Sequence, residues 1–239
     1  MSFPQPTSTA NPQPRIKESS ALQKVMWFGI LQLVSLASGW VSWFYVASAA
    51  IPRIIAQNLT SASTPSEVSA ALAPLFSAMT LVVPLIAAIN IVSLVVLTIG
   101  FRELREVDRP AFSLPSTLMI LMVVGGIITV VGVVPFLSGI SNIIAQAPTS
   151  TSAAPSAAFF SAIAPFFFAL TLFAIGGLLA FIGLIAGLIL GLWRVGSRYD
   201  QTIIKLGAIF AIIPVLDIAA PVLVIVGAQQ ARRKVSSGG

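Results

Sequence analysis

Long apolar runs separated by short polar segments make up most of this chain. The runs cover about residues 25–50, 71–100, 116–140, 159–192 and 203–228. Each is at least as long as the roughly 20 residues that a helix needs to cross a bilayer. Apolar and polar positions do not alternate within them, which argues against a transmembrane β-barrel. Backbone groups in hydrocarbon must pair within the chain, so we predict an all-α, polytopic transmembrane bundle of about five membrane helices.

Two stretches about ninety residues apart repeat each other. The sequence IIAQ occurs at 54–57 and again at 143–146. The stretches 71–81 (ALAPLFSAMTL) and 162–172 (AIAPFFFALTL) are identical at seven of eleven positions. Each copy spans the end of one apolar run, a small polar loop and the start of the next run. We interpret the chain as a tandem, parallel two-helix repeat plus a C-terminal helix, and expect the two hairpins to superpose with Pro74 over Pro165.

The polar segments divide the chain into five parts. These are a disordered Pro/Ser/Thr-rich tail (1–20), a first transmembrane hairpin with its basic loop (21–115), a second hairpin with its basic loop (116–202), a last transmembrane or re-entrant segment (203–229) and a basic tail (230–239). Within the first basic loop, charges at helical spacing predict a short solvated helix over 101–115.

Basic residues gather in alternate connecting segments. With five crossings, the N-terminal tail and the loops 101–115 and 193–202 share one side and hold most of the cations, whereas the opposite loops hold only Arg53. Cytoplasmic loops are enriched in Lys and Arg. We therefore expect a multi-pass protein of the cell membrane with its N-terminus and basic loops in the cytoplasm.

The C-terminal tail conflicts with this orientation. Five crossings put the three cations at 232–234 on the outer side. Alternatively, the last apolar run turns back between Pro214 and Pro221, so that each half is a short re-entrant element. We prefer five crossings, because the early spans usually dominate orientation.

Composition limits the possible functions. The chain is 57% hydrophobic and 8% charged, whereas soluble domains carry about 25% charged residues. Its net charge of +6 lies in loops and tails, where contact with lipid head groups is expected and nucleic-acid binding is not. The chain has no His and no Cys, which removes the usual metal ligands and catalytic triads. We expect no enzyme activity, no catalytic residues, no metal site and no cofactor.

Small residues line one face of the fourth run. Gly176, Ala180, Gly183, Gly187 and Gly191 recur at spacings of three or four, which put them on one side of a helix. Small residues at this spacing let a second membrane helix approach closely. We predict helix packing within the chain; the alternative is an interface with another subunit.

Asp217 is the only ionisable residue well inside an apolar run. A charge at the bilayer centre costs at least about 2.5 kcal/mol, so its surroundings must offset this cost. Three arrangements do so: a protonated carboxyl group bonded to backbone near Pro214 or Pro221, a contact with Asn90 or Gln32, or a re-entrant segment near water. A weaker signal is the glycosylation sequon at Asn58, in a loop on the predicted outer side.

Part of the chain resembles a known family. Residues 191–200 (GLWRVGSRYD), 203–209 (IIKLGAI) and 212–217 (IIPVLD) are similar to the C-terminal signature of an archaeal multi-pass membrane family, domain of unknown function 973. The resemblance covers about thirty residues. It implies an archaeal plasma membrane and no particular activity or site residues.

Two functions remain after these exclusions. The first is a non-catalytic structural or accessory subunit of a larger membrane assembly, with lipids and other subunits or copies of itself as partners. The alternative is a small transporter or channel, in which Asp217 is the intramembrane ionisable site and Asn90 a polar neighbour. Co-purification from detergent distinguishes the two, because stoichiometric partners favour the first.

Overall fold

The computed structural model describes residues 12–56, 64–145, 157–213 and 216–237, which are helical apart from short turns. The elements are α1 (Pro12–Ala56), α2 (Pro65–Val107), α3 (Arg109–Ala145), α4 (Ala157–Ile182), the π-helix η1 (Gly183–Ile189), α5 (Leu190–Arg198), α6 (Thr202–Phe210) and α7 (Ala219–Ser237). In these ranges four helical stretches are long and apolar enough to cross a membrane: Arg15–Ser48, Ala70–Val107, Arg109–Ile144 and Ile163–Arg198. The predicted all-α membrane bundle is therefore confirmed.

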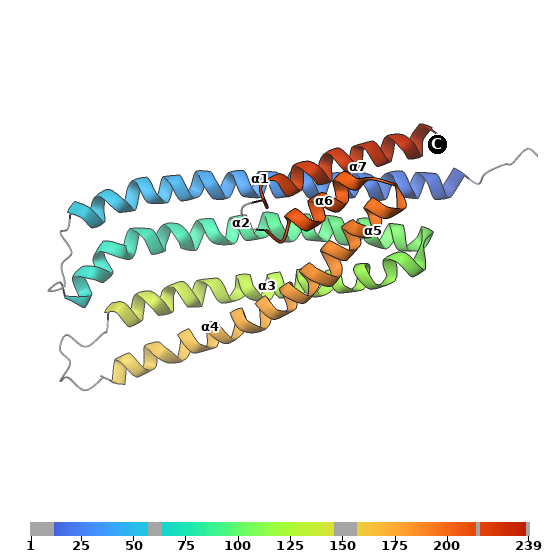
Figure 1. The fold of residues 1–239 in the computed structure, drawn as a ribbon. Helices are drawn as coiled ribbons and strands as arrows, with labels where there is room; N and C mark the ends of the chain where they lie inside the picture. Colours follow the sequence, from blue (N-terminus) through green and yellow to red (C-terminus); the bar gives the residue numbers. More distant parts are fainter. Residues whose placement is uncertain (1–11, 57–63, 146–156, 214–215, 238–239) are drawn as a thin grey trace, which may run out of the picture.

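The helices form two layers (Figure 1). The long helices α1 to α4 lie side by side in chain order. The end of α1, the start of α2, the end of α3 and the start of α4 lie at one end of the bundle, which we call the loop end. After α4, the chain continues through η1 and α5 across α3, and α6 and α7 then form a hairpin in which α7 packs on α1. This second layer covers only part of the length of the first. Superposition of the α1–α2 and α3–α4 hairpins stays a prediction.

One end of the bundle collects the charges. It contains the start of α1, the α2–α3 turn, the α5–α6 turn and the end of α7 (Figure 1), and we call it the basic end. Ion pairs there connect helices that are distant in sequence. They are Lys24–Glu103 at 2.7 Å, Lys17–Glu106 at 2.6 Å, Arg198–Glu18 at 2.6 Å and Arg198–Asp108 at 2.6 Å. Beside them, burial raises the pKa of Tyr199 to about 12, so this phenol is neutral at physiological pH.

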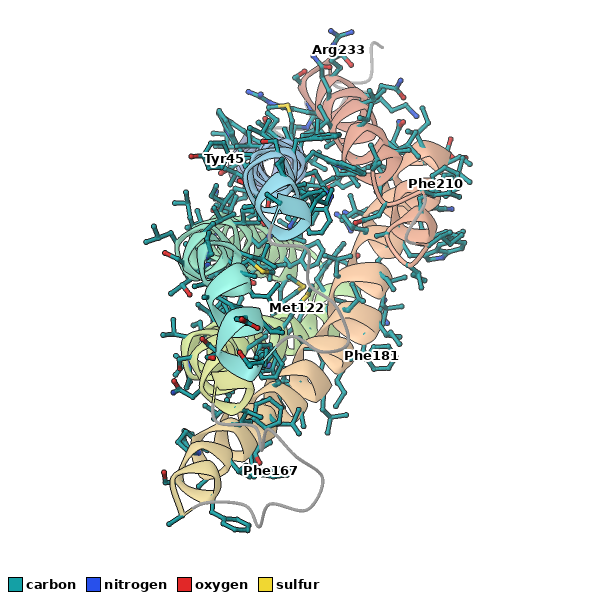
Figure 2. All side chains as sticks on the ribbon, turned by 90° about the vertical axis from the view of Figure 1, so that its left-hand side faces the viewer. Tyr45, Met122, Phe167, Phe181, Phe210 and Arg233 are labelled. Atoms are coloured by element: carbon teal, nitrogen blue, oxygen red, sulfur yellow. The ribbon has the colours of Figure 1, made fainter. Side chains whose placement is uncertain are left out.

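The packed core lies toward the same end. The largest fully buried side chains include Leu22, Val25, Leu97, Phe101, Leu104, Phe112, Met119, Leu192, Val195, Ile204 and Val224. Figure 2, which views the bundle from its loop end, has Met122 near the centre and Phe181 and Phe210 on the outside. Large apolar side chains remain exposed on α1 to α4, including Val41, Leu81 and Phe168. Lipid is the solvent that suits such a surface, as composition predicts.

The last apolar run differs from the expected fifth crossing. Helix α6 has nine residues, which is about 14 Å of helix and less than half of a hydrocarbon core. Residues 211–213 and 216–218 form turns, and α7 returns to the basic end, where Arg232 Nε donates to Ser19 Oγ at 3.3 Å. The run thus forms a helical hairpin, which is the shape that the re-entrant alternative predicts. This also explains the basic tail, because the cations at 232–234 join the other cations at the basic end.

Backbone hydrogen bonds join the described residues of the hairpin tip. Asp217 N donates to Ile213 O at 2.9 Å, Leu216 N to the same carbonyl at 2.8 Å, and Ala219 N to Leu216 O at 2.9 Å. Irregular backbone at membrane depth is tolerated only where it is buried in protein or lines a cavity, and where its groups are paired. These turn bonds reduce the cost that such a turn would have in a bilayer.

Two helix starts are earlier than the sequence analysis expects. Residues 12–20 belong to α1 instead of a disordered tail, because Lys17, Glu18 and Ser19 have partners on α2, α5 and α7. Helix α2 begins at Pro65 with a capping box, in which Glu67 N donates to Thr64 Oγ1 at 3.4 Å and Thr64 N to Glu67 Oε2 at 2.7 Å. The sequence Thr-Pro-Ser-Glu is a recognisable signal for such a start.

The segment 101–115 is not a separate helix. Helix α2 runs to Val107, and Asp108 alone separates it from α3. Asp108 Oδ1 accepts from Ala111 N at 3.2 Å, which caps the first turn of α3. The acidic residues of this segment pair with α1 and α5 instead of with their own helix neighbours.

Candidate functional site

Asp217 lies at the tip of the α6–α7 hairpin, where two cavities meet. The inner cavity, of about 290 Å³, lies between the two layers and is lined by residues of α1, α2, α3, η1, α5, α6 and α7. The outer groove, of about 550 Å³, runs along α1 and α2 beyond the hairpin tip and contains Trp40 and Trp43. Gln32, Asn90 and Asp217 line both cavities. The structure therefore brings the two predicted polar residues, Asn90 and Asp217, to one place.

The distance of this place from the basic end suggests its depth. Gln32 is about two helical turns beyond Lys24, or roughly 12 Å along α1. Lys24 belongs to the ion pairs of the basic end, and a hydrocarbon core is about 30 Å thick. If the basic end lies at one membrane surface, we expect Asp217 near the middle of the bilayer.

Four polar side chains connect α1 and α2 beside Asp217. Gln32 Nε2 donates to Ser93 Oγ at 2.7 Å, and Asn90 Nδ2 donates to Ser35 Oγ at 2.8 Å. Ser93 Oγ in turn donates to Asn90 O at 2.7 Å. Sequence reasoning missed both serines. Their spacing could have indicated them: Ser35 follows Gln32 and Ser93 follows Asn90 by three residues, which puts each serine on the same helix face as the amide side chain.

The Asp217 carboxylate is not used in this network. In the ranges that the structure describes, it forms neither a hydrogen bond nor an ion pair. Asp217 lines the same cavities as Asn90 and Gln32, the two residues named in the second of the three arrangements considered for it, and makes no hydrogen bond to either. The other sequence-based candidate, Asn58, lies outside the described residues.

The small-residue stripe on α4, η1 and α5 faces other helices of the same chain. A Cβ on Gly176 would lie 2.5 Å from Thr129 Oγ1, one on Gly183 2.5 Å from Met122 N, and one on Gly187 2.8 Å from Met119 N. A Cβ on Gly191 would overlap the Phe101 ring, and Ala180 N lies 2.5 Å from the position of a Cβ on Gly125. Backbones of α4–α5 and α3 therefore approach too closely for side chains between them.

Part of this stripe is π-helical, and it forms a wall of the inner cavity. Leu184 and Leu188, both in η1, line that cavity opposite α1 and α2. π-helical turns are rare and are found frequently at functional sites. The hairpin tip, the polar side chains of α1 and α2, and η1 thus all line the inner cavity.

Comparison with known families identifies the chain. The profile of the family described as "Protein of unknown function (DUF973)" matches residues 15–238. The chain belongs to the DUF973 family. No curated protein and no solved structure matches it.

The DUF973 match includes every element of the site. It extends from the start of α1 to the end of α7, and so contains Gln32, Asn90 and Asp217. With its four candidate spans, this DUF973 chain is a multi-pass membrane protein. The family description names no activity, so function must be argued from the site itself.

A leucine at Gly187 tests the packing of this DUF973 chain. We expect Gly187→Leu to lower its stability in detergent by about 3 kcal/mol, because the new side chain overlaps the backbone of α3 at Met119. Thermal unfolding followed by size-exclusion chromatography measures the loss. A variant as stable as the parent would mean that α3 and η1 do not touch here.

Proposed function

We propose that this DUF973 protein is a non-catalytic transporter or channel of the cell membrane, with Asp217 as its intramembrane ionisable site. Its basic end faces the cytoplasm, as the positive-inside rule favours. One observation carries the proposal: Asp217 lines both the inner cavity and the outer groove. A solute that moves between the two must pass this carboxylate.

The form of the hairpin supports a transport role. Transporters bind their solutes near the bilayer midplane, at helices that are interrupted there. Here the nine-residue α6 and the 19-residue α7 are separated by a turn that contains Asp217. Beyond the inner cavity, the buried core around Phe101 and Leu104 closes the basic end. This arrangement has an open outer side, a central acid and a closed inner side.

A catalytic role is less well supported by the residues around the cavities. Among the residues that the structure describes, Asp217 is the only acidic or basic one that lines either of them. General acid–base catalysis and covalent catalysis both need a second activating group within hydrogen-bond reach of the first. Amides and hydroxyls that bind each other do not supply one.

Ion flux into liposomes tests the proposal. The purified full-length protein is reconstituted, and entry of H⁺, Na⁺ and K⁺ is followed with dyes enclosed in the liposomes. We expect flux of at least one of these cations in the parent and a loss of at least tenfold in Asp217→Asn. The amide keeps the shape of the carboxyl group and removes its charge.

Asp200→Asn is the matched control. Asp200 is an exposed acid in the α5–α6 turn at the basic end, it is not among the residues that line either cavity, and the exchange is chemically the same. Its flux should equal that of the parent. Absence of flux in the parent, or equal flux in Asp217→Asn, would overturn the transport proposal.

The outer groove supports a second candidate, an accessory subunit. The α6–α7 hairpin ends at Asp217, so the groove along Ser35, Gly39 and Trp43 is not covered by it. A membrane helix of another subunit, or of a second copy, could occupy this face. Stoichiometric co-purification of one protein in mild detergent, lost when Gly39 is changed to Leu, would favour this candidate over transport.

A further inference from the structure

The outer groove has the size of a binding site for an organic molecule. Its volume of about 550 Å³ lies inside the range of roughly 300–1,000 Å³ that small-molecule sites occupy. One wall is a single face of α1, formed by Gln32, Ser35, Gly39, Trp40 and Trp43. Gln32, Leu36, Trp40 and Trp43 follow each other at spacings of four, four and three, with Ser35 and Gly39 beside them, so the wall is continuous over three helical turns.

Among the described lining residues of the groove, the only ionisable side chain is an acid. Asp217 lies at its inner end, and the other lining residues are neutral. An unpaired carboxylate in a low-dielectric setting is strongly stabilised by a cation beside it. The groove thus favours a positively charged ligand over a neutral or anionic one.

The side-chain carbonyl of Asn90, which also lines the groove, is a hydrogen-bond acceptor near Asp217. Asn90 Nδ2 already donates to Ser35 Oγ at 2.8 Å and to Ile86 O at 3.2 Å. An amide nitrogen has two donors, so both are used and the side-chain carbonyl remains as an acceptor. Acceptors beside a carboxylate complement a cation and repel an anion.

Two indole rings extend the groove toward the outer side. Trp40 and Trp43 are 52% and 60% exposed, although both line the groove. Indole faces attract cations, most strongly those that are organic and weakly hydrated. Apolar substituents on such a cation would also cover the rings, which a hydrated metal ion cannot do.

We propose that the outer groove binds a lipophilic organic cation, with its charge at Asp217 and its apolar groups on Trp40 and Trp43. The groove is open beside an apolar helix surface, so the ligand enters from the bilayer. The inference names the solute class of the proposed transporter and rests on that function only for the movement of the ligand, because binding is measured separately.

Binding of tetraphenylphosphonium to the purified full-length protein tests the inference. Equilibrium dialysis in detergent should give saturable binding in the parent. Asp217→Asn and the double variant Trp40→Ala/Trp43→Ala should each weaken it at least tenfold. Tetraphenylborate, which has the same shape and the opposite charge, should show no binding that depends on Asp217.

Two further variants separate the site from folding and from nonspecific partition. Asp217→Glu keeps the charge and should retain most of the binding, so a loss in Asp217→Asn is not a folding defect. Trp27→Ala removes an exposed Trp of α1 that does not line the groove, and it should bind as the parent does. Lack of saturable binding, or equal binding in all variants, would overturn the inference.

The result is distinguishable from the flux test. Asp217-dependent flux of small cations without tetraphenylphosphonium binding would reject the ligand class and leave the transport proposal intact. Binding that depends on Asp217 and both tryptophans, without any flux, would reject transport and keep the site.

Discussion

Cysteines introduced as Ser237→Cys and Ser197→Cys will be labelled from the same side of the membrane, and Ser66→Cys from the opposite side. Ser237 ends α7, Ser197 precedes the α5–α6 turn, and Ser66 lies in the first turn of α2 at the loop end. All three side chains are exposed. The reason is the re-entrant hairpin, which returns the C-terminus to the basic end.

The chain suits this experiment because it contains no cysteine of its own. A membrane-impermeant maleimide is applied to sealed vesicles and, in parallel, to opened ones. Each reporter should be labelled almost completely from one side only. A fifth crossing would instead give Ser237→Cys the labelling of Ser66→Cys and would contradict the hairpin.

Adjacent glycines of α4 should respond in opposite directions to alanine. A Cβ on Gly176 would lie 2.5 Å from Thr129 Oγ1 and 2.8 Å from Gly125 O, whereas one on Gly177 would have no neighbour within 4 Å. We expect Gly176→Ala to cost about 2 kcal/mol through overpacking. Gly177→Ala should be neutral or stabilising by up to about 1 kcal/mol, since alanine has the higher helix propensity.

The difference should be visible in the melting temperature in detergent. For a chain of this size, about 2 kcal/mol corresponds to a lowering of roughly 4–8 °C. Gly177→Ala is the control for the loss of glycine itself, because the two positions are neighbours in one helix. Equal melting temperatures for both variants would show that α3 and α4 are not in contact at Gly176.

The sequence predicts the helix class well, because the length and hydropathy of a run report directly on the bilayer. The last run is the instructive exception. Its length suits a crossing, and the chain reverses at Asp217 only because the turn bonds its own backbone and packs on α1 and α2. This packing involves residues nearly two hundred positions away in the sequence, such as Gln32. A local sequence pattern around Asp217 therefore cannot predict it.

The candidate site was likewise predictable only in part from the sequence. Asp217 and Asn90 are conspicuous as polar residues in apolar runs, and both line the cavities. The roles of Ser35 and Ser93 follow only from which partners the fold supplies. The basic end is similar, since Lys24 and Glu103 pair across 79 positions of sequence, whereas sequence reasoning considered pairs within one helix.

The π-helical segment also determines the direction in which a stripe of small residues runs. In an α-helix, four residues turn about 40° more than a full circle. Glycines spaced by four therefore move gradually around the helix axis and no longer face a straight neighbouring helix. A π-turn is wider, and four residues then fall short of a full circle. Because residues 183–189 are π-helical, η1 compensates for this rotation of the small residues around the helix axis. Gly183 and Gly187 remain over α3 and Gly191 reaches Phe101. An unbroken α-helix of the same sequence would turn each of these residues further around the axis and carry Gly191 away from Phe101.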